Sequence, residues 1–256
     1  MKVRLLPSTA GRPSQYQCLT SFVIDDRLAI DAGSIGFALE PNQIGSIHDF
    51  IITHTHTDHT ASLPIYVAEA FPLLEAPVIV HGTTEVISAL REFVFNDKIW
   101  PNFEQIHLNN GTGPALEFRK LEPRVATSIA GFKVTPIPVN HVVPTCGFLI
   151  EGETAAVLFT ADTYITEEIW KAARAADNLK AVFVDVSFPN EMAELAEASK
   201  HLTPALLRNE LRKLDRKVDV YAVHIKPTNR DEVIRQIATL GEDRVSVGEI
   251  DREYIW

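Results

Sequence analysis

The chain has 256 residues, of which 46% are hydrophobic and 23% charged, an ordinary composition for a globular protein of one or two domains. Its formal net charge of −10 argues against a large nucleic-acid interface, because such an interface needs clustered lysine and arginine. A small anionic substrate stays compatible with this charge, since bound metal ions would reverse its local sign.

The cysteines and the N-terminal stretch exclude further classes of protein. Cys18 and Cys146 are too few for a disulfide scaffold and are not spaced like zinc-binding pairs, so we expect both to be small buried side chains. Residues 1–17 lack the apolar run of a signal peptide, and no stretch approaches the ~18 apolar residues of a membrane span. We therefore expect a soluble, cytoplasmic protein. No linker, repeat or low-complexity tract divides it, which predicts a single domain over residues 1–256.

The first part of the chain is predicted to be mainly strands. They are expected at Val3–Leu6, Cys18–Ile24, Leu28–Asp31, Phe50–Ile52 and Pro77–His81. A hairpin turn at Asp25-Asp26 joins the second strand to the third. Helices are expected from Leu63 onward and over Thr83–Phe93, whereas residues 96–115, with Asn, Gly and Pro throughout, are expected to be irregular.

The second part of the chain shows the same order of strands followed by helices, without repeating the sequence of the first part. Strands are expected at Glu117–Lys120, Phe132–Val139, Gly147–Glu151, Ala156–Thr160, Ala181–Asp185 and Val218–His224. Helices are expected at Thr166–Ala176 (with Thr166 as its N-cap), Glu191–Ser199, Pro204–Leu214 and Arg230–Leu240. The order of strands followed by helices occurs in both parts of the chain. It predicts an α/β fold in which two mixed β-sheets pack face to face with helices on the outer faces.

One short stretch, T-H-T-H-T-D-H-T-A at residues 53–61, carries most of the chemical information. It holds three histidines and one aspartate within six positions, namely His54, His56, Asp58 and His59. It follows an apolar strand, and ligand sites of α/β sheets lie at the carboxyl ends of strands. Neutral imidazole and carboxylate suit zinc, manganese or iron. The stretch therefore predicts a metal site; the alternative is a hydrophilic loop with incidental histidines.

Three further groups stand where apolar strands end. His141 ends P-I-P-V-N-H, Asp162 ends V-L-F-T-A-D, and His224 ends D-V-Y-A-V-H. Each alone is more often a hydrogen-bonded structural residue. Together with the cluster they supply five histidines and two aspartates, which is enough for two adjacent metal ions with a bridging carboxylate.

This order of strand-end residues resembles the metallo-β-lactamase superfamily, an αβ/βα sandwich with a dinuclear metal site at one edge. I-D-A-G at residues 30–33 resembles its first motif, in which the aspartate supports the site. Five further stretches resemble the class II cyclic-nucleotide phosphodiesterases: F-N-D-K-I-W-P-N-F (95–103), T-C-G-F-L-I-E (145–151), L-F-T-A-D-T (158–163), V-D-V-S-F-P-N with K-H-L-T-P (184–190, 200–204) and V-H-I-K-P-T (223–228).

The similarity runs from residue 16 to about residue 230, and the chain departs from the family in two places. The family's usual signature is H-x-H-L-D-H followed by an apolar residue, whereas Thr57 and Thr60 stand at those two positions here. Tyr66-Val67-Ala68 stand where the signature ends in a small residue, serine and alanine or proline.

The resemblance implies a role for each strand-end residue. His54, His56 and His141 would hold one divalent ion, Asp58, His59 and His224 the other, with Asp162 bridging them. Zinc is the expected metal, with manganese and iron(II) as alternatives. A hydroxide that bridges the two ions would attack the phosphorus of a 3′,5′-cyclic phosphodiester.

The leaving 3′ oxygen needs a proton, and two residues are expected to supply it. Asp185 and His201 stand where related tRNA 3′-processing nucleases carry an acid and a histidine, and with Asp58 they complete the expected catalytic set. Two alternatives stay open. Water could be the proton source, and His201 could be a helix-entry residue in a surface loop.

The leading interpretation is thus a metal-dependent phosphodiesterase whose partner is a small cyclic nucleotide. One alternative is a phosphodiesterase for another substrate such as RNA 3′ ends, against which the acidic charge weighs. Another is a non-catalytic, metal-stabilised nucleotide-binding module, against which the full ligand set weighs. No nucleic-acid or membrane partner is expected, and a homodimer is left open.

Five aromatic or histidine residues outside the expected site also received an interpretation. Trp100 and Phe103 either stack on a purine as part of a lid or anchor the 96–115 segment to the core. His81 is expected to be structural, and His48 and His107 are expected to be surface residues.

Overall fold

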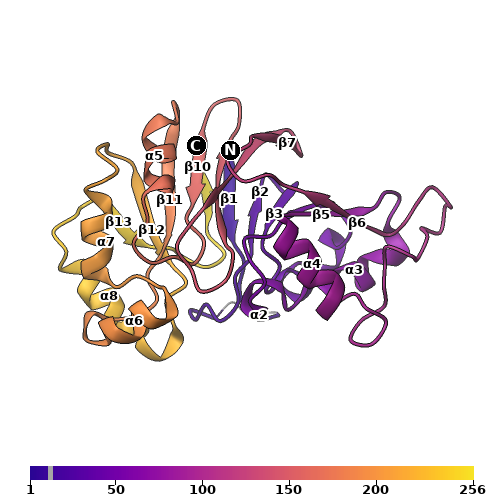
Figure 1. The fold of residues 1–256 in the computed structure, drawn as a ribbon, viewed down its shortest axis with the longest axis horizontal. Helices are drawn as coiled ribbons and strands as arrows, with labels where there is room; N and C mark the ends of the chain where they lie inside the picture. The colour runs from indigo at the N-terminus through magenta and orange to yellow at the C-terminus, as the bar shows by residue number, and fades with distance from the viewer. Residues whose placement is uncertain (11–13) are drawn as a thin grey trace.

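Two seven-stranded sheets form the frame of the molecule, which a computed structural model describes for residues 1–10 and 14–256 (Figure 1). The first sheet has the order β14 (Glu253–Ile255), β1 (Lys2–Leu5), β2 (Phe22–Ile24), β3 (Leu28–Ile30), β4 (Asp49–Ile51), β5 (Val78–Gly82), β6 (Leu116–Lys120). The second has the order β13 (Val245–Val247), β12 (Asp219–Val223), β11 (Leu179–Asp185), β10 (Ala156–Phe159), β9 (Cys146–Glu151), β8 (Phe132–Pro138), β7 (Thr127–Ile129).

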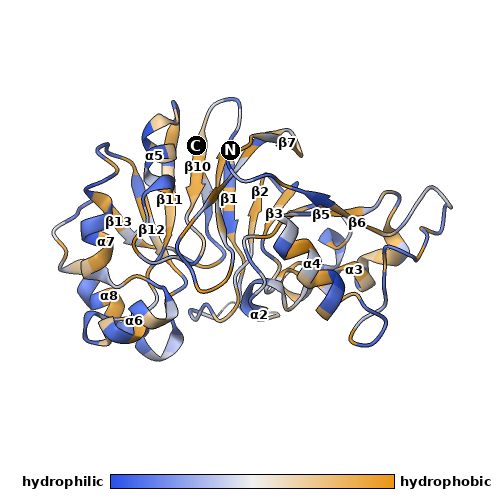
Figure 2. Cartoon of the chain, in the orientation of Figure 1, coloured by the Kyte–Doolittle hydropathy of each residue, from blue (hydrophilic) through white to orange (hydrophobic). Residues whose placement is uncertain are grey.

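The two sheets pack face to face over one buried apolar layer. Phe22 on the first sheet meets Phe159 and Phe183 on the second, with ring centroids 5.0 and 5.3 Å apart. Helices cover the outer faces, α3 and α4 on one side and α5, α7 and α8 on the other (Figure 1). Figure 2 shows apolar strands in both sheets beneath helices of mixed polarity, as burial of one helix face requires. The predicted α/β sandwich is confirmed.

Eight α-helices are described in residues 1–10 and 14–256. They are α1 (Ile35–Ala38), α2 (Thr57–Thr60), α3 (Leu63–Ala70), α4 (Thr84–Phe93), α5 (Glu168–Ala175), α6 (Ala193–Ser199), α7 (Pro204–Leu211) and α8 (Arg230–Ala238). Short 3₁₀ turns cover Pro41–Gln43, Phe71–Leu73, Asn190–Met192 and Pro227–Asn229. None of the helices in this described part combines the length and the apolar character that crossing a lipid bilayer requires.

Strand direction brings the carboxyl ends of four separate strands to one edge. β3, β4, β5 and β6 run parallel, as do β10, β11, β12 and β13. β8 and β10 are both antiparallel to β9, so they point the same way as each other. The segments that follow β4, β8, β10 and β12 therefore meet where the two sheets adjoin.

Several local predictions are wrong in informative ways. The expected strand from Cys18 begins only at Phe22, and Cys18 is exposed, whereas Cys146 is buried as predicted. Thr166 does not cap α5, whose N-cap is Glu167, and the Thr166 backbone N–H donates to the buried carboxylate of Glu210. The hairpin at Asp25-Asp26 is confirmed.

The irregular 96–115 segment lies at the end of the first sheet away from the strand ends just described. The carbonyl of Ala115 accepts from Val78 at the amino end of β5, and the Asn110 side chain donates to the Glu75 carbonyl. Phe103 is buried against Phe71, with ring centroids 5.8 Å apart, and Trp100 packs on the same core. The lid interpretation is therefore wrong, and the anchoring interpretation is confirmed.

Candidate metal centre

The four strand ends deliver all seven predicted ligands to one place. The segment after β4 supplies His54, His56, Asp58 and His59, of which the last two lie on the short helix α2 and not on a loop as expected. His141, Asp162 and His224 follow β8, β10 and β12. Two of these strand ends adopt left-handed backbone conformations, at Ala161 (φ 56°) and His224 (φ 60°). Such conformations are costly for residues other than glycine, and they persist at functional sites because the surrounding packing enforces them.

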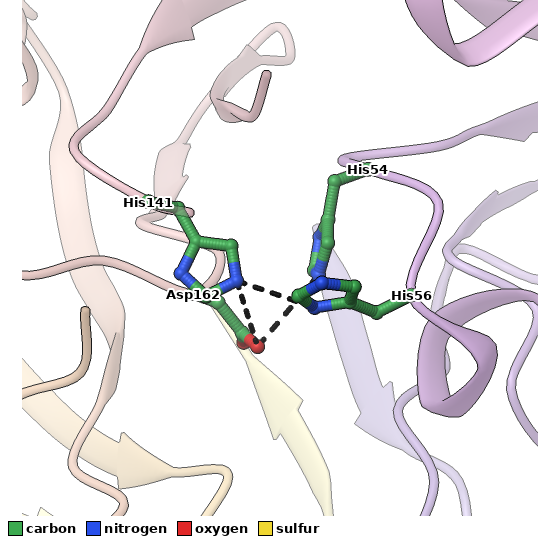
Figure 3. Close-up of side chains that lie close together, drawn as sticks. All are labelled: His54, His56, His141 and Asp162. Atoms are coloured by element: carbon green, nitrogen blue, oxygen red, sulfur yellow. Dashed lines mark hydrogen bonds and ion pairs between the residues drawn. The ribbon is translucent and has the colours of Figure 1, made fainter. Parts of the chain in front are cut away.

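Three histidines and one aspartate form what we call the first group: His54, His56, His141 and Asp162 (Figure 3). One ligand atom from each lies within 4.8 Å of the others. His141 Nε2 is 3.3 Å from His56 Nδ1, and Asp162 Oδ2 is 3.8 Å from His54 Nε2. The side chains converge on a common centre, as ligands of one ion do.

The second group consists of Asp58, His59 and His224. His224 Nε2 lies 3.2 Å from Asp58 Oδ2. The other oxygen of Asp162, Oδ1, lies 3.3 Å from His59 Nε2 and 3.5 Å from His224 Nδ1. One carboxylate thus stands between the two groups and turns one oxygen to each.

The donor chemistry fits divalent metal ions. Among residues 1–10 and 14–256, His54 Nε2 and His59 Nε2 are buried and have no hydrogen-bond partner, which is costly unless a bound ion satisfies them. His141 and His224 likewise turn Nε2 toward the ligand groups. Nitrogen and carboxylate donors of this kind suit zinc and other first-row metals. The cluster therefore supports use of a divalent metal.

The outward ring nitrogens are held by partners outside the ligand set. His59 Nδ1 donates to Asp31 Oδ2 at 2.7 Å, and Thr53 donates its backbone N–H and its hydroxyl to the same carboxylate. His54 Nδ1 donates to the Thr53 hydroxyl at 2.9 Å, and His141 Nδ1 donates to the Lys200 carbonyl at 3.1 Å. For His54 and His141, fixing Nδ1–H in this way leaves the inward Nε2 as the free base that a metal needs.

Asp31 and Gly33 belong to the I-D-A-G motif, and their positions explain it. Asp31 supports His59 from behind, as the resemblance implied. A side chain at Gly33 would place its Cβ 2.0 Å from the Asp58 carbonyl oxygen. Only glycine lets this turn lie against the segment that carries the second group.

The two groups differ in protonation. Burial, helped by the charge of His59, lowers the pKa of His54 well below its usual 6.5. Burial alone would also lower the pKa of His59, but the carboxylates of Asp162 and Asp31 outweigh it and raise that pKa well above 6.5. The pKa of His224 is raised to about 9, since Asp162, Asp185 and Asp58 outweigh the effect of burial. The three histidines of the first group are therefore kept neutral, whereas His59 and His224 would have to release a proton to bind an ion.

Asp185 and His201 form a buried pair beside both groups. His201 Nδ1 donates to Asp185 Oδ2 at 2.7 Å, and the Ser187 hydroxyl donates to Asp185 Oδ1 at 2.7 Å. Burial opposes ionisation of Asp185, but the charge of His201 prevails and lowers the pKa of Asp185 to about 2. The His201 ring centroid lies 5.2 Å from that of His141 and 5.4 Å from that of His224. The surface-loop alternative for His201 is therefore wrong.

Sequence reasoning missed three side chains at this site: Thr53, Ser187 and Lys226. Ser187 accepts from His224 Nδ1 at 3.0 Å, and the ammonium of Lys226 lies 3.5 Å from Asp58 Oδ2. Lys226 could have been found from alternation, because residues two apart in an extended segment share a face and His224 was already a predicted ligand. Thr53 and Ser187 also form hydrogen bonds to Asp31 and His224, which are distant along the chain, and such bonds leave no local pattern.

The remaining histidines lie outside the two groups. His81 is buried and pairs with Asp49 at 2.8 Å, so its structural assignment is confirmed. His107 is exposed, as expected of a surface residue. His48 is half-buried, with Nδ1 3.1 Å from the Pro77 carbonyl oxygen, so it lies partly at the surface.

The two-sheet architecture, with this cluster at the edge where the sheets adjoin, is that of the metallo-β-lactamase fold. Residues 41–234 match the model of the class II cAMP phosphodiesterases, and the chain belongs to this family. The crystal structure of unliganded yeast PDE1 has the same fold, with a TM-score of 0.79, 18% sequence identity and coverage of 98% of both chains.

Two curated relatives show how far the sequence similarity extends. The 3′,5′-cyclic-nucleotide phosphodiesterase of Schizosaccharomyces pombe is 29% identical over 202 residues, which cover 71% of this chain and 55% of that protein. The ribonuclease Z of Mycobacterium bovis is 30% identical over 141 residues, covering 50% of this chain and 49% of that protein. The chain thus spans about half the length of these curated relatives.

Proposed function

We propose that this chain is a metal-dependent 3′,5′-cyclic-nucleotide phosphodiesterase. Membership of the class II family supports this function. The observation that carries the proposal is the position of Asp162, whose two oxygens face two separate groups of histidines. An acid shared in this way is what a pair of ions acting on one phosphoryl group needs.

The proposed ligand sets are the two groups described above. His54, His56 and His141 hold one ion, Asp58, His59 and His224 hold the other, and Asp162 contributes to both. We propose zinc, because a set of five imidazoles and two carboxylates is typical of it. The bound ions would supply positive charge at the phosphoryl oxygens and acidify the attacking water.

His201 is proposed as the general acid for the departing 3′ oxygen. Its Nδ1–H is engaged by Asp185, which fixes the ring and leaves Nε2 as the nitrogen that delivers a proton. Stacking of the His201 ring on His224, with an interplanar angle of 18°, keeps it beside the second group.

The two alternative functions have less support. The ribonuclease Z similarity covers half of the chain, and a net charge of −10 opposes the phosphate backbone of a long RNA. A non-catalytic nucleotide-binding module would not need the complete donor set or the buried Asp185–His201 pair.

The test is turnover by metal-loaded protein. Cyclic AMP, cyclic GMP, bis(p-nitrophenyl) phosphate, an RNA with a 3′ extension, a lactone and a β-lactam are compared at equal concentrations with zinc or manganese present. We expect a cyclic nucleotide to have the highest kcat/KM. Cleavage of the RNA faster than that of either cyclic nucleotide contradicts the proposal. So does hydrolysis of the lactone or the β-lactam at a higher rate than that of every phosphodiester. Tight nucleotide binding without turnover contradicts it in favour of the binding module.

A further inference from the structure

Lys226 is a cation beside the second group that the roles proposed above leave unused. His224 and Lys226 face Asp58, whereas Ile225 between them is buried against the outer helices of the second sheet. The Lys226 backbone N–H donates to the Ser187 carbonyl at 3.2 Å, and Pro227 begins a 3₁₀ turn immediately after it. The side chain is one-third exposed, at 33%. The lysine is thus fixed at its backbone and open to solvent at its ammonium.

The ammonium of Lys226 has partners that metal binding would take away. Its Nζ lies 3.5 Å from Asp58 Oδ2 and 3.4 Å from His224 Nε2. In residues 1–10 and 14–256, Asp58 is the one carboxylate within ion-pair distance of this ammonium. An ion held by Asp58 and His224 would occupy the same oxygen and nitrogen, and its positive charge would repel the ammonium. Lys226 would then need a new anion, in a place where solvent and substrate have access.

We propose that Lys226 is a phosphate-binding residue that directs its ammonium at a non-bridging oxygen of the substrate's phosphoryl group. A compact point charge with three rotatable donors suits such an oxygen. The ligand class is a phosphate anion, which separates phosphoesters from lactones and β-lactams, because neither of these offers a phosphoryl oxygen. That the anion is a cyclic nucleotide rests on the proposed function, whereas the binding of phosphate by Lys226 does not.

The first experiment measures phosphate binding without turnover. Lys226→Met, Lys226→Arg and the unaltered protein are loaded with zinc, checked for metal content, and titrated with inorganic phosphate in a calorimeter. We expect Lys226→Met to bind phosphate about 10- to 100-fold more weakly, the range for loss of a charge-assisted hydrogen bond. Lys226→Arg should keep most of the affinity, because it keeps the charge.

Lys200→Met is the matched control. Lys200 is also half-buried and lies on the His141 side of the site, but its ammonium sits 5.1 Å from the Tyr164 ring centroid. Its contact with His141 uses the backbone carbonyl, which the substitution keeps. Phosphate affinity should therefore be unchanged in Lys200→Met. Equal losses in both variants would indicate a general charge effect and overturn the assignment.

Two further outcomes separate this inference from the proposed function. Unchanged phosphate affinity in a fully metal-loaded Lys226→Met overturns the inference, even if cyclic AMP is hydrolysed. Loss of metal from this variant overturns it too, because Lys226 would then be supporting the ligand set. If the unaltered protein fails to hydrolyse cyclic nucleotides but its phosphate binding depends on Lys226, the function is wrong and the inference stands.

Discussion

The two ligand groups share Asp162 but differ in the residues behind them. The first group is backed by neutral acceptors, the Thr53 hydroxyl and the Lys200 carbonyl. The second is backed by the carboxylates of Asp31 and Asp185. Histidines of similar burial therefore differ in pKa: burial lowers the pKa of His54 well below its usual value, whereas Asp162 and Asp31 raise that of His59 well above it. The shared carboxylate and the side chains behind each ligand thus act together on the protonation of the histidines.

The largest effect is expected from replacing Asp162, the residue whose carboxylate the two ligand groups share. Asp162→Asn should lower kcat for cyclic AMP by at least about 10³-fold, because even the loss of a supporting partner costs 10- to 100-fold. Metal content, measured by elemental analysis, should fall with it. His81→Ala is the control, since His81 is a buried histidine paired with Asp49 and lies outside both groups. Similar losses of activity per folded molecule in the two variants would mean that the ligand set is misassigned.

The next effect concerns the acid beside the second group. His201→Ala should lose about 10²–10⁴-fold in kcat with cyclic AMP, the usual range for general acid catalysis. The loss should be much smaller with bis(p-nitrophenyl) phosphate, because p-nitrophenolate leaves without a proton. The measurement is the ratio of the two rates at unchanged metal content. A loss of equal size on both substrates would assign His201 to binding or folding.

Asp185→Asn should show the same preference more weakly. The imidazole of His201 remains, but it loses the carboxylate that orients it. We expect a loss of about 10-fold with cyclic AMP and almost none with the activated diester. An effect larger than that of His201→Ala would contradict this order of roles.

Two substitutions behind the ligands sharpen the comparison between the groups. Asp31→Asn should weaken binding of one ion about 10- to 100-fold, since Asp31 holds His59 of the second group, and should leave the other ion bound. Thr53→Val should have a smaller effect that both ions share, because Thr53 contacts Asp31 and His54. Calorimetric zinc titration of each variant gives both affinities. Equal weakening of both ions in Asp31→Asn would show that the groups are not separable.

The smallest effect on catalysis is expected far from the site. Trp100→Ala should lower the free energy of unfolding by about 1–3 kcal/mol, because a half-buried ring that packs on the core is lost. Its KM for cyclic AMP should not change, since the segment lies at the other end of the first sheet. Denaturant unfolding and steady-state kinetics check the two halves of this expectation. A raised KM would return the segment to the role of a substrate wall.

The sequence could predict the ligands because each follows an apolar strand, and strand ends converge in a sandwich of this kind. It could not predict the three-residue strands β7, β13 and β14, since so short a run gains its stability from neighbouring strands and carries no periodicity of its own. The position of Trp100 depended on strand direction, which only the pairing of β5 with β6 reveals. Lys226 received no role from the sequence, although its spacing from His224 placed it on the same face of that segment, and its contacts with Asp58 and His224 appear only in the structure.

The central claim is that one chain holds two divalent ions through a shared carboxylate. It is tested most directly by stripping the purified protein with a chelator and titrating it with zinc in a calorimeter, alongside Asp162→Asn. We predict two equivalents of zinc per chain, with cyclic AMP hydrolysis restored as the second binds. In Asp162→Asn both affinities should fall together. Saturation at one equivalent or none, or a variant that loses one ion and keeps the other at full affinity, would contradict the account.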